Sequence, residues 1–212
     1  MEILQTISEM LQKGKAKDVK ALVQEALDQG IAAEKVLNDG LLAGMSVIGE
    51  KFKNNEIFVP DVLIAARAMK MGSQVLKPYL SDEGVKAQGK VVIGTVQGDL
   101  HDIGKNLVSM MMEGKGLEVI DLGVDTPPER FVSTAIENDA DIIACSALLT
   151  TTMNNIKAVV DAVRDAGVRD KVTIMVGGAP LTEAFAKSIG ADIYTPDAAS
   201  AADAALSAVQ KG

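Results

Sequence analysis

Histidine and cysteine are scarce in this chain, which has one of each among 212 residues. The single cysteine, Cys145, excludes a disulfide within the chain. One cysteine and one histidine also cannot supply the usual four cysteine or histidine ligands of a structural zinc site. His101 is therefore the one imidazole that this chain can offer to a metal or to a proton transfer.

Aromatic and basic residues are also few. Aromatic residues form 3% of the chain, so few rings are present to stack on nucleic-acid bases. The 21 lysines and arginines are outnumbered by 29 acidic residues, and the net charge of −8 leaves no basic stripe for phosphates. No apolar run approaches the roughly 18 residues of a membrane span. Because the first residues lack a secretory signal pattern, we expect a cytoplasmic protein without membrane or nucleic-acid partners.

Apolar side chains, by contrast, are abundant and regularly spaced. The chain is 48% hydrophobic and 24% charged, which predicts a packed core. In residues 1–80, apolar positions repeat at helical spacing in four stretches, near 3–11, 19–27, 33–52 and 60–78. Four amphipathic helices joined by short turns predict a small helical bundle.

The spacing changes after a polar, glycine-containing stretch at 81–90, which is typical of a linker. In residues 91–212, short apolar runs alternate with helical segments, a pattern that predicts a parallel sheet covered on both faces. Five such units favour an α/β, flavodoxin-like (Rossmann-like) sheet of order 2-1-3-4-5. Strands are predicted over 91–96, 118–122, 142–146, 173–176 and 192–194, and helices over 103–115, 128–138, 153–166, 181–188 and 198–210.

His101 falls in the loop Gly98–Gly104, at the carboxyl end of the first predicted strand. Open α/β sheets bind their ligands at that edge, and imidazole is a common metal ligand. Three further clusters follow other strands at the same edge, Ser146–Thr152, Gly177–Pro180 and Tyr194–Ala198. The simpler interpretation of each is structural: a surface histidine with Asp102 as helix cap, hydroxyls that cap helices, and glycines in ordinary turns.

Two known kinds of site do not fit this edge. The glycines lack the GxGxxG spacing and the Gly-Lys-Ser/Thr run of phosphate-binding loops. A hydrolase in which His101 and Asp99 serve Cys145 or Ser146 can be drawn, but neither nucleophile lies in a G-x-S-x-G elbow. A flavodoxin-like binder of another small molecule remains as an alternative.

The edge residues, taken in order, resemble a known signature. Asp99-x-His101-x-x-Gly104, then Ser146-x-Leu148, then Gly177-Gly178 is similar to the cobalamin-binding pattern DxHxxG…SxL…GG. The intervals, 41 residues over 105–145 and 28 residues over 149–176, fit that pattern. The pattern is shared by cobalamin-dependent methionine synthase, corrinoid methyltransferase proteins and several mutases.

The first 80 residues extend the resemblance. Gly44-Met45-x-x-x-Gly49-Glu50-x-Phe52, with Ile57–Pro60 and Ala65–Met69, looks like the helical cap that precedes the corrin domain in methionine synthase. The mutases instead carry a large barrel, which 212 residues cannot hold. The chain therefore resembles the small corrinoid proteins of multi-component methyltransferase systems, with a cap at 1–80, a linker at 81–90 that would act as a hinge, and a cobalamin-binding domain at 91–212.

This resemblance implies roles for individual residues. His101 would be the lower axial ligand of cobalt, Asp99 would accept its other ring N–H, and the hydroxyl of Thr152, six positions after Ser146, would complete this catalytic relay. Methionine synthase has serine at the place of Thr152, so the resemblance leaves the geometry of the relay open. The implied cofactor-binding residues are Gly98, Asp99, Leu100, His101, Asp102, Ile103, Gly104, Ser146, Leu148, Thr150, Gly177 and Gly178, with Phe58, Val59 and Met69 of the cap.

The resemblance also implies a function. The cobalt(I) form of a bound cobalamin or related corrinoid would take a methyl group from a donor held by a substrate-specific methyltransferase. As methylcobalamin it would pass that group to a second methyltransferase, for which tetrahydrofolate is the favoured acceptor, and a reductive activator would restore cobalt(I). Methoxy-aromatic compounds, as in an O-demethylase, are the favoured donors over methylamines or betaines. On this view the chain is a carrier rather than a complete enzyme. The alternative is a cobalamin-dependent sensor or storage protein.

Overall fold

A computed structural model of the chain describes residues 2–82 and 86–211. The chain divides into two compact units, and each is described by itself. One consists of Met1–Ala87 with Gly114–Gly116, and the other of Gln88–Glu113 with Leu117–Gly212. No described helix is both long enough and apolar enough to span a membrane.

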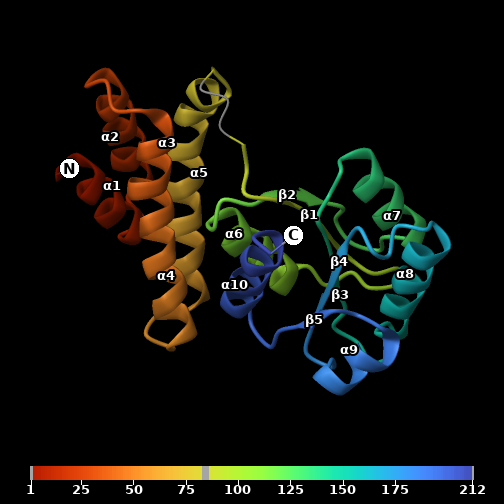
Figure 1. The fold of residues 1–212 in the computed structure, drawn as a ribbon. Helices are drawn as coiled ribbons and strands as arrows, with labels where there is room; N and C mark the ends of the chain where they lie inside the picture. Colours follow the sequence, from red (N-terminus) through yellow and green to blue (C-terminus); the bar gives the residue numbers. More distant parts are fainter. Residues whose placement is uncertain (1, 83–85, 212) are drawn as a thin grey trace. The chain divides into compact units, whose positions relative to one another are not determined.

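The first unit is helical (Figure 1). Its amphipathic helices bury the apolar positions that the spacing predicted, among them Ile7, Leu11, Val19 and Leu41, each with no exposed surface. The predicted helical bundle is confirmed. Its elements are α1 (Glu2–Gln12), α2 (Ala16–Asp28), α3 (Ala33–Lys35), the π-helix η1 (Val36–Leu42), α4 (Ala43–Lys53) and α5 (Val59–Asp82).

Two details of this unit differ from the sequence prediction. The helix expected over 33–52 is interrupted by the π-helical stretch Val36–Leu42, whose wider turn rotates the side chains that follow. The helix expected to end near Pro78 continues to Asp82. A proline so close to the end removes only one backbone donor, so the last turn can form around it. Of the predicted linker 81–90, residues 81–82 are therefore helical and 83–85 lie outside the described residues.

The second unit contains a five-stranded parallel sheet of order β2-β1-β3-β4-β5, as predicted. The strands begin and end within two residues of the predicted positions, because most of them are short, largely apolar runs between turn residues. Their bounds are β1 (Lys90–Thr95), β2 (Glu118–Asp121), β3 (Ile142–Ser146), β4 (Thr173–Gly177) and β5 (Ile193–Tyr194).

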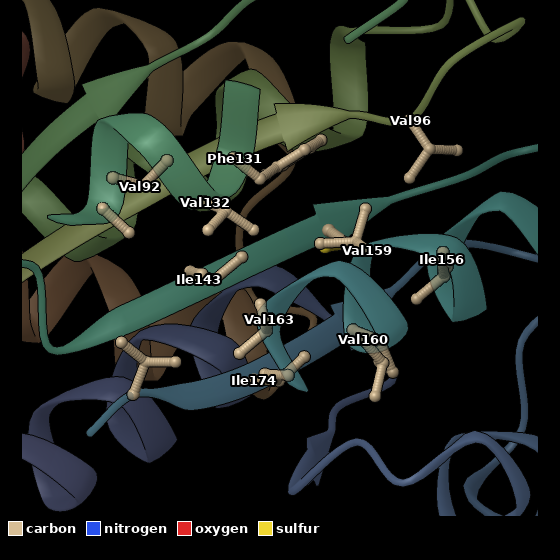
Figure 2. Packing of buried hydrophobic residues seen from close by; sticks show 14 of the residues in the cluster. Val92, Val96, Phe131, Val132, Ile143, Ile156, Val159, Val160, Val163 and Ile174 are labelled. Atoms are coloured by element: carbon tan, nitrogen blue, oxygen red, sulfur yellow. The ribbon is translucent and has the colours of Figure 1, made fainter. Parts of the chain in front are cut away.

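Helices cover both faces of this sheet (Figure 1). Helices α6 (Ile103–Glu113) and α10 (Ala198–Val209) pack together on one face. The other face carries α7 (Pro128–Glu137), α8 (Asn154–Asp165) and α9 (Glu183–Ile189). Figure 2 shows the core on this second face, where Phe131 of α7 and Val159 of α8 meet Ile143 of β3.

The sheet register sets the level at which the functional loops begin. Thr95 pairs with Ser146, and Ser146 pairs with Gly177. The carboxyl ends of β1, β3 and β4 therefore lie side by side at one edge of the sheet. We call this edge, formed by residues 97–104, 121–126, 146–152 and 177–181, the rim. Every residue of the predicted signature lies on it.

Candidate functional site

Asp99 is at the centre of the rim and has no exposed surface. Its carboxylate accepts four hydrogen bonds. Oδ1 accepts from Nδ1 of His101 at 2.7 Å and from the His101 backbone N–H at 3.0 Å. Oδ2 accepts from the Thr152 hydroxyl at 2.6 Å and from the Leu148 backbone N–H at 2.8 Å. The structure thus brings Asp99, His101 and Thr152 into one chain of hydrogen bonds, across 53 positions of sequence.

The charge state of Asp99 determines which nitrogen of His101 is free. Burial raises the pKa of Asp99, but the hydrogen bonds from Thr152, Leu148 and His101 outweigh it and hold the pKa well below its ordinary value of 3.8. The group is therefore a carboxylate at neutral pH and can only accept hydrogen bonds. Its contact with Nδ1 of His101 requires a proton on Nδ1, so Nε2 of neutral His101 keeps its lone pair for a metal.

This carboxylate predicts a pH-dependent stability for the apoprotein. Asp99→Asn is expected to lower the free energy of unfolding by about 2–3 kcal/mol at pH 7, because a buried charged acceptor is lost. A lowered folded-state pKa contributes stability that is fully present above the unfolded value of 3.8. This contribution declines as the pH falls below that value and is lost as the pH passes through the lower folded-state pKa. The difference between wild type and variant should therefore shrink below about pH 4.

Urea unfolding followed by circular dichroism measures this difference, since the chain has no tryptophan for fluorescence. The other carboxylates titrate in both proteins and cancel in the comparison. Equal losses of stability in wild type and Asp99→Asn between pH 7 and pH 3 would contradict the assignment.

The loops of the rim that carry His101 and Leu148 also carry large apolar side chains that are exposed. The His101 side chain is 50% exposed. Beside it, Leu100 is 70% exposed and Ile103 is 78% exposed, while Leu148 and Leu149 are each 42% exposed. Several exposed large apolar side chains on one rim favour a place where a ligand or a partner is bound. Leu149 lies within the predicted cluster Ser146–Thr152 but was not assigned to the cofactor, and Val124 of the β2–α7 loop was not predicted at all, because the signature includes neither position.

The glycines of the rim fall into two kinds. Gly178 is held at φ +136°, and a Cβ there would lie 1.8 Å from the carbonyl oxygen of Ala147, so the chain itself requires glycine. Gly104 is exposed, and a Cβ there would meet nothing within 4 Å. The protein alone does not need glycine at 104, which indicates a surface kept clear for close approach of a ligand.

Other predicted residues of the sheet edge lie outside the hydrogen-bond chain of Asp99, His101 and Thr152. Ser146 is half-buried at the end of β3, and Thr150 is exposed. Asp102 accepts a hydrogen bond from the side chain of Asn106 at 3.1 Å. In the cluster after β5, Asp197 caps α10 by accepting from the backbone N–H of Ser200 at 2.8 Å, so that residue has a structural role.

The predicted contact residues of the helical unit differ in exposure. Phe58 is 69% exposed, Val59 is half-buried, and Met69 is only 8% exposed. Met69 therefore offers little surface to a ligand and contributes mainly to packing. Contact of these residues with a cofactor stays a prediction.

The cysteine form of the hydrolase alternative does not fit the structure. Cys145 is buried in the sheet, and desolvation raises the pKa of its thiol to about 12. A cysteine nucleophile must be a thiolate, which Cys145 is not at neutral pH.

The donor set of the rim fits a corrinoid. Among residues 2–82 and 86–211, no three His, Cys, Asp or Glu side chains gather in a way that could hold a bare metal ion. The rim presents one imidazole with a free Nε2 on a broad apolar surface. That arrangement suits a metal whose remaining positions are filled by a large, mostly apolar macrocycle.

Fold and rim together define a cobalamin-binding α/β protein, and comparison with protein families agrees. A B12 binding domain family matches residues 89–206, more than half of the chain, and a second B12 binding domain family matches residues 3–77. The chain belongs to the family of small corrinoid proteins of methyltransferase systems, whose cofactor is a cobalamin or a related corrinoid.

Similar proteins cover nearly the whole chain. A corrinoid protein of Desulfitobacterium hafniense is 39% identical over 97% of this chain and 96% of its own length. The dimethylamine corrinoid protein of Methanosarcina barkeri is 42% identical over 94% of each chain. The methanol:cobalamin methyltransferase complex MtaBC from Methanosarcina barkeri contains a chain that is 30% identical, with a TM-score of 0.90 over 100% of this chain and 81% of that one.

Proposed function

We propose that this protein is a methyl carrier that shuttles a methyl group between two methyltransferases. The observation that carries the proposal is the buried Asp99 carboxylate that fixes Nδ1–H of a half-exposed His101 on an apolar rim. The names of similar proteins support the methyltransferase setting, since they include a dimethylamine corrinoid protein and a chain of a methanol methyltransferase complex.

Each rim residue has a task in this proposal. His101 would ligate cobalt through Nε2. Asp99 holds the Nδ1 proton and raises the basicity of the ring, as carboxylates do for metal-bound histidines. Thr152 supplies Asp99 with a hydroxyl hydrogen bond at 2.6 Å, which keeps the carboxylate charged although it is buried.

The remaining rim residues hold and shield the cofactor. Leu100, Ile103 and Leu148 supply apolar surface, and Gly104 leaves room for close approach. Gly177 and Gly178, with Ser146 and Thr150, would line the path of the nucleotide tail. The bound corrinoid supplies the group-transfer chemistry itself, because its cobalt can accept a methyl group and release it again.

The proposal extends to the exchange partners. One methyltransferase would present the donor, for which methylamines are the class named among similar proteins and methoxy-aromatic compounds the class that the sequence analysis favoured. A second methyltransferase would use tetrahydrofolate as acceptor, and a reductive activator would restore the cobalt(I) state.

A methyl-transfer assay tests this function. The full-length holoprotein is reduced with titanium(III) citrate and mixed with a methyltransferase encoded beside it, together with either dimethylamine or a methoxy-aromatic compound. A carrier should acquire the absorption spectrum of the methylated cofactor with one donor and lose it when tetrahydrofolate and the second methyltransferase are added.

Methyl iodide serves as the control donor, because it needs no partner enzyme. A holoprotein that is methylated by methyl iodide but by no enzyme-donor pair would favour the alternative, a sensor or storage protein. Loss of methyl only to an acceptor other than tetrahydrofolate would reject the acceptor assignment and keep the carrier.

A further inference from the structure

A few hydrogen bonds join the loop that carries His101 to neighbouring segments of the α/β unit. At its start, the side chain of Asn155 donates to the Gln97 carbonyl at 2.7 Å. The carboxylate of Asp125 accepts from the Gly98 N–H at 2.7 Å, and the Asp125 N–H donates to the Asp99 carbonyl at 2.9 Å. Asp125 has a left-handed backbone conformation with φ +49°, which aspartate tolerates better than most residues.

His101 itself makes hydrogen bonds to two residues, Asp99 and Thr95. Its N–H and its Nδ1 both contact Asp99, which is two positions away and turns with it. Its backbone carbonyl accepts a hydrogen bond from the hydroxyl of Thr95 at 2.8 Å. Thr95 is the last residue of β1, so this bond joins His101 directly to the rigid sheet.

Packing alone does not explain a hydroxyl group at position 95. Thr95 has no exposed surface, and Ile93 of the same strand and Val96, which directly follows it, are buried apolar residues. Valine has nearly the same shape and would remove the cost of burying a hydroxyl. A threonine at this position is explained by the hydrogen bond that it makes.

We propose that Thr95 is a positioning residue for His101, whose hydrogen bond to the His101 carbonyl sets how strongly the imidazole coordinates cobalt. This inference rests on the proposed function, in which His101 is the ligand. When the bond is absent, the segment at His101 gains freedom that coordination must then remove. The net value of one neutral hydrogen bond corresponds to about a fivefold change in an equilibrium constant.

Three variants test the proposal. Thr95→Val removes the hydroxyl and keeps the shape, and Thr95→Ser restores the hydroxyl. Thr126→Val is the matched control, because Thr126 is equally buried but its hydroxyl lies 3.5 Å from the Leu122 carbonyl and does not contact the His101 loop.

The first measurement uses the full-length apoprotein. Hydrogen exchange at the His101 amide should become about fivefold faster in Thr95→Val, and it should return to the wild-type rate in Thr95→Ser. Thr126→Val should leave that rate unchanged. An unchanged rate in Thr95→Val, or an equal increase in Thr126→Val, would overturn the positioning role whatever the cofactor does.

The second measurement is the cobalt(II)/cobalt(I) midpoint potential of the holoprotein. Coordination by His101 stabilises cobalt(II), since cobalt(I) is usually four-coordinate. A fivefold weaker coordination should therefore raise the potential by about 40 mV in Thr95→Val and in neither of the other variants. If Thr95→Ser shifts the potential as much as Thr95→Val, the effect is due to packing and the proposal fails. A wild-type holoprotein with no coordinated imidazole would instead reject the proposed function.

Discussion

Replacing His101 with alanine is expected to give a holoprotein that still carries the corrinoid but has no imidazole bound to cobalt. The apolar side chains Leu100, Ile103 and Leu148 remain exposed for the cofactor, so binding should persist. The affinity should fall at least about tenfold, since even the partners of a ligating histidine have effects of this size. The absorption spectrum should change from the form with coordinated imidazole to the form with no protein ligand.

The chain offers an unusually direct check on this prediction. His101 is the only histidine, so labelling all histidine with nitrogen-15 labels a single imidazole. In the cobalt(II) form, electron paramagnetic resonance should show a nitrogen splitting that changes from a triplet to a doublet on labelling. The His101→Ala protein should show no such splitting.

Free imidazole provides the control for misfolding. The His101 side chain is 50% exposed, so its removal leaves an open space that imidazole can enter from solvent. Imidazole added to the His101→Ala holoprotein should restore the splitting. A wild-type spectrum in the variant, or an isotope-independent spectrum in wild type, would show that His101 is not the ligand.

The fold could be predicted well where one kind of spacing prevails over a whole element. The run Ile142–Ser146 is apolar up to its last residue and fits a buried strand, and α8 repeats its apolar positions at helical spacing. Prediction failed where a local choice depends on tertiary contacts. The π-helix at Val36–Leu42 is of this kind, because it packs against α1 and α4 in a geometry that the local sequence does not favour. The continuation of α5 past Pro78 has a local reason, since a proline near the helix end removes only one backbone donor.

The site could be predicted only as far as the signature extends. The signature placed Asp99, His101 and Thr152 together, and the structure joins them by hydrogen bonds. The signature includes neither Thr95 nor Asp125. The aspartate contacts Gly98 across 27 positions, and only the three-dimensional path of the β2–α7 loop shows that the two meet.

Two glycine variants should separate the folding of the rim from its use. Gly178→Ala is expected to destabilise the apoprotein by about 3 kcal/mol or more. Its Cβ would lie 1.8 Å from the Ala147 carbonyl oxygen, and φ +136° is unfavourable for alanine. The Ala147 carbonyl belongs to the backbone, so relief requires the β3–α8 loop to move. That loop carries Leu148 and Thr152, which donate hydrogen bonds to Asp99.

Gly104→Ala should have the opposite effect on stability. Gly104 lies in the first turn of α6, where alanine is a better helix former by roughly 0.5–1 kcal/mol and its Cβ meets nothing within 4 Å. If the corrinoid approaches this backbone closely, the added methyl group should nevertheless weaken corrinoid binding, by about tenfold for an overpacked contact.

Urea unfolding of the two apoproteins and titration of each with cobalamin measure these effects separately. In Gly178→Ala, loss of binding should accompany loss of stability, because one displaced loop causes both. In Gly104→Ala, binding should be lost while stability is kept or increased. A Gly104→Ala protein that binds cobalamin as wild type does would show that the surface beside His101 is not where the cofactor lies close. That result would move the corrinoid away from α6 without affecting the assignment of the fold.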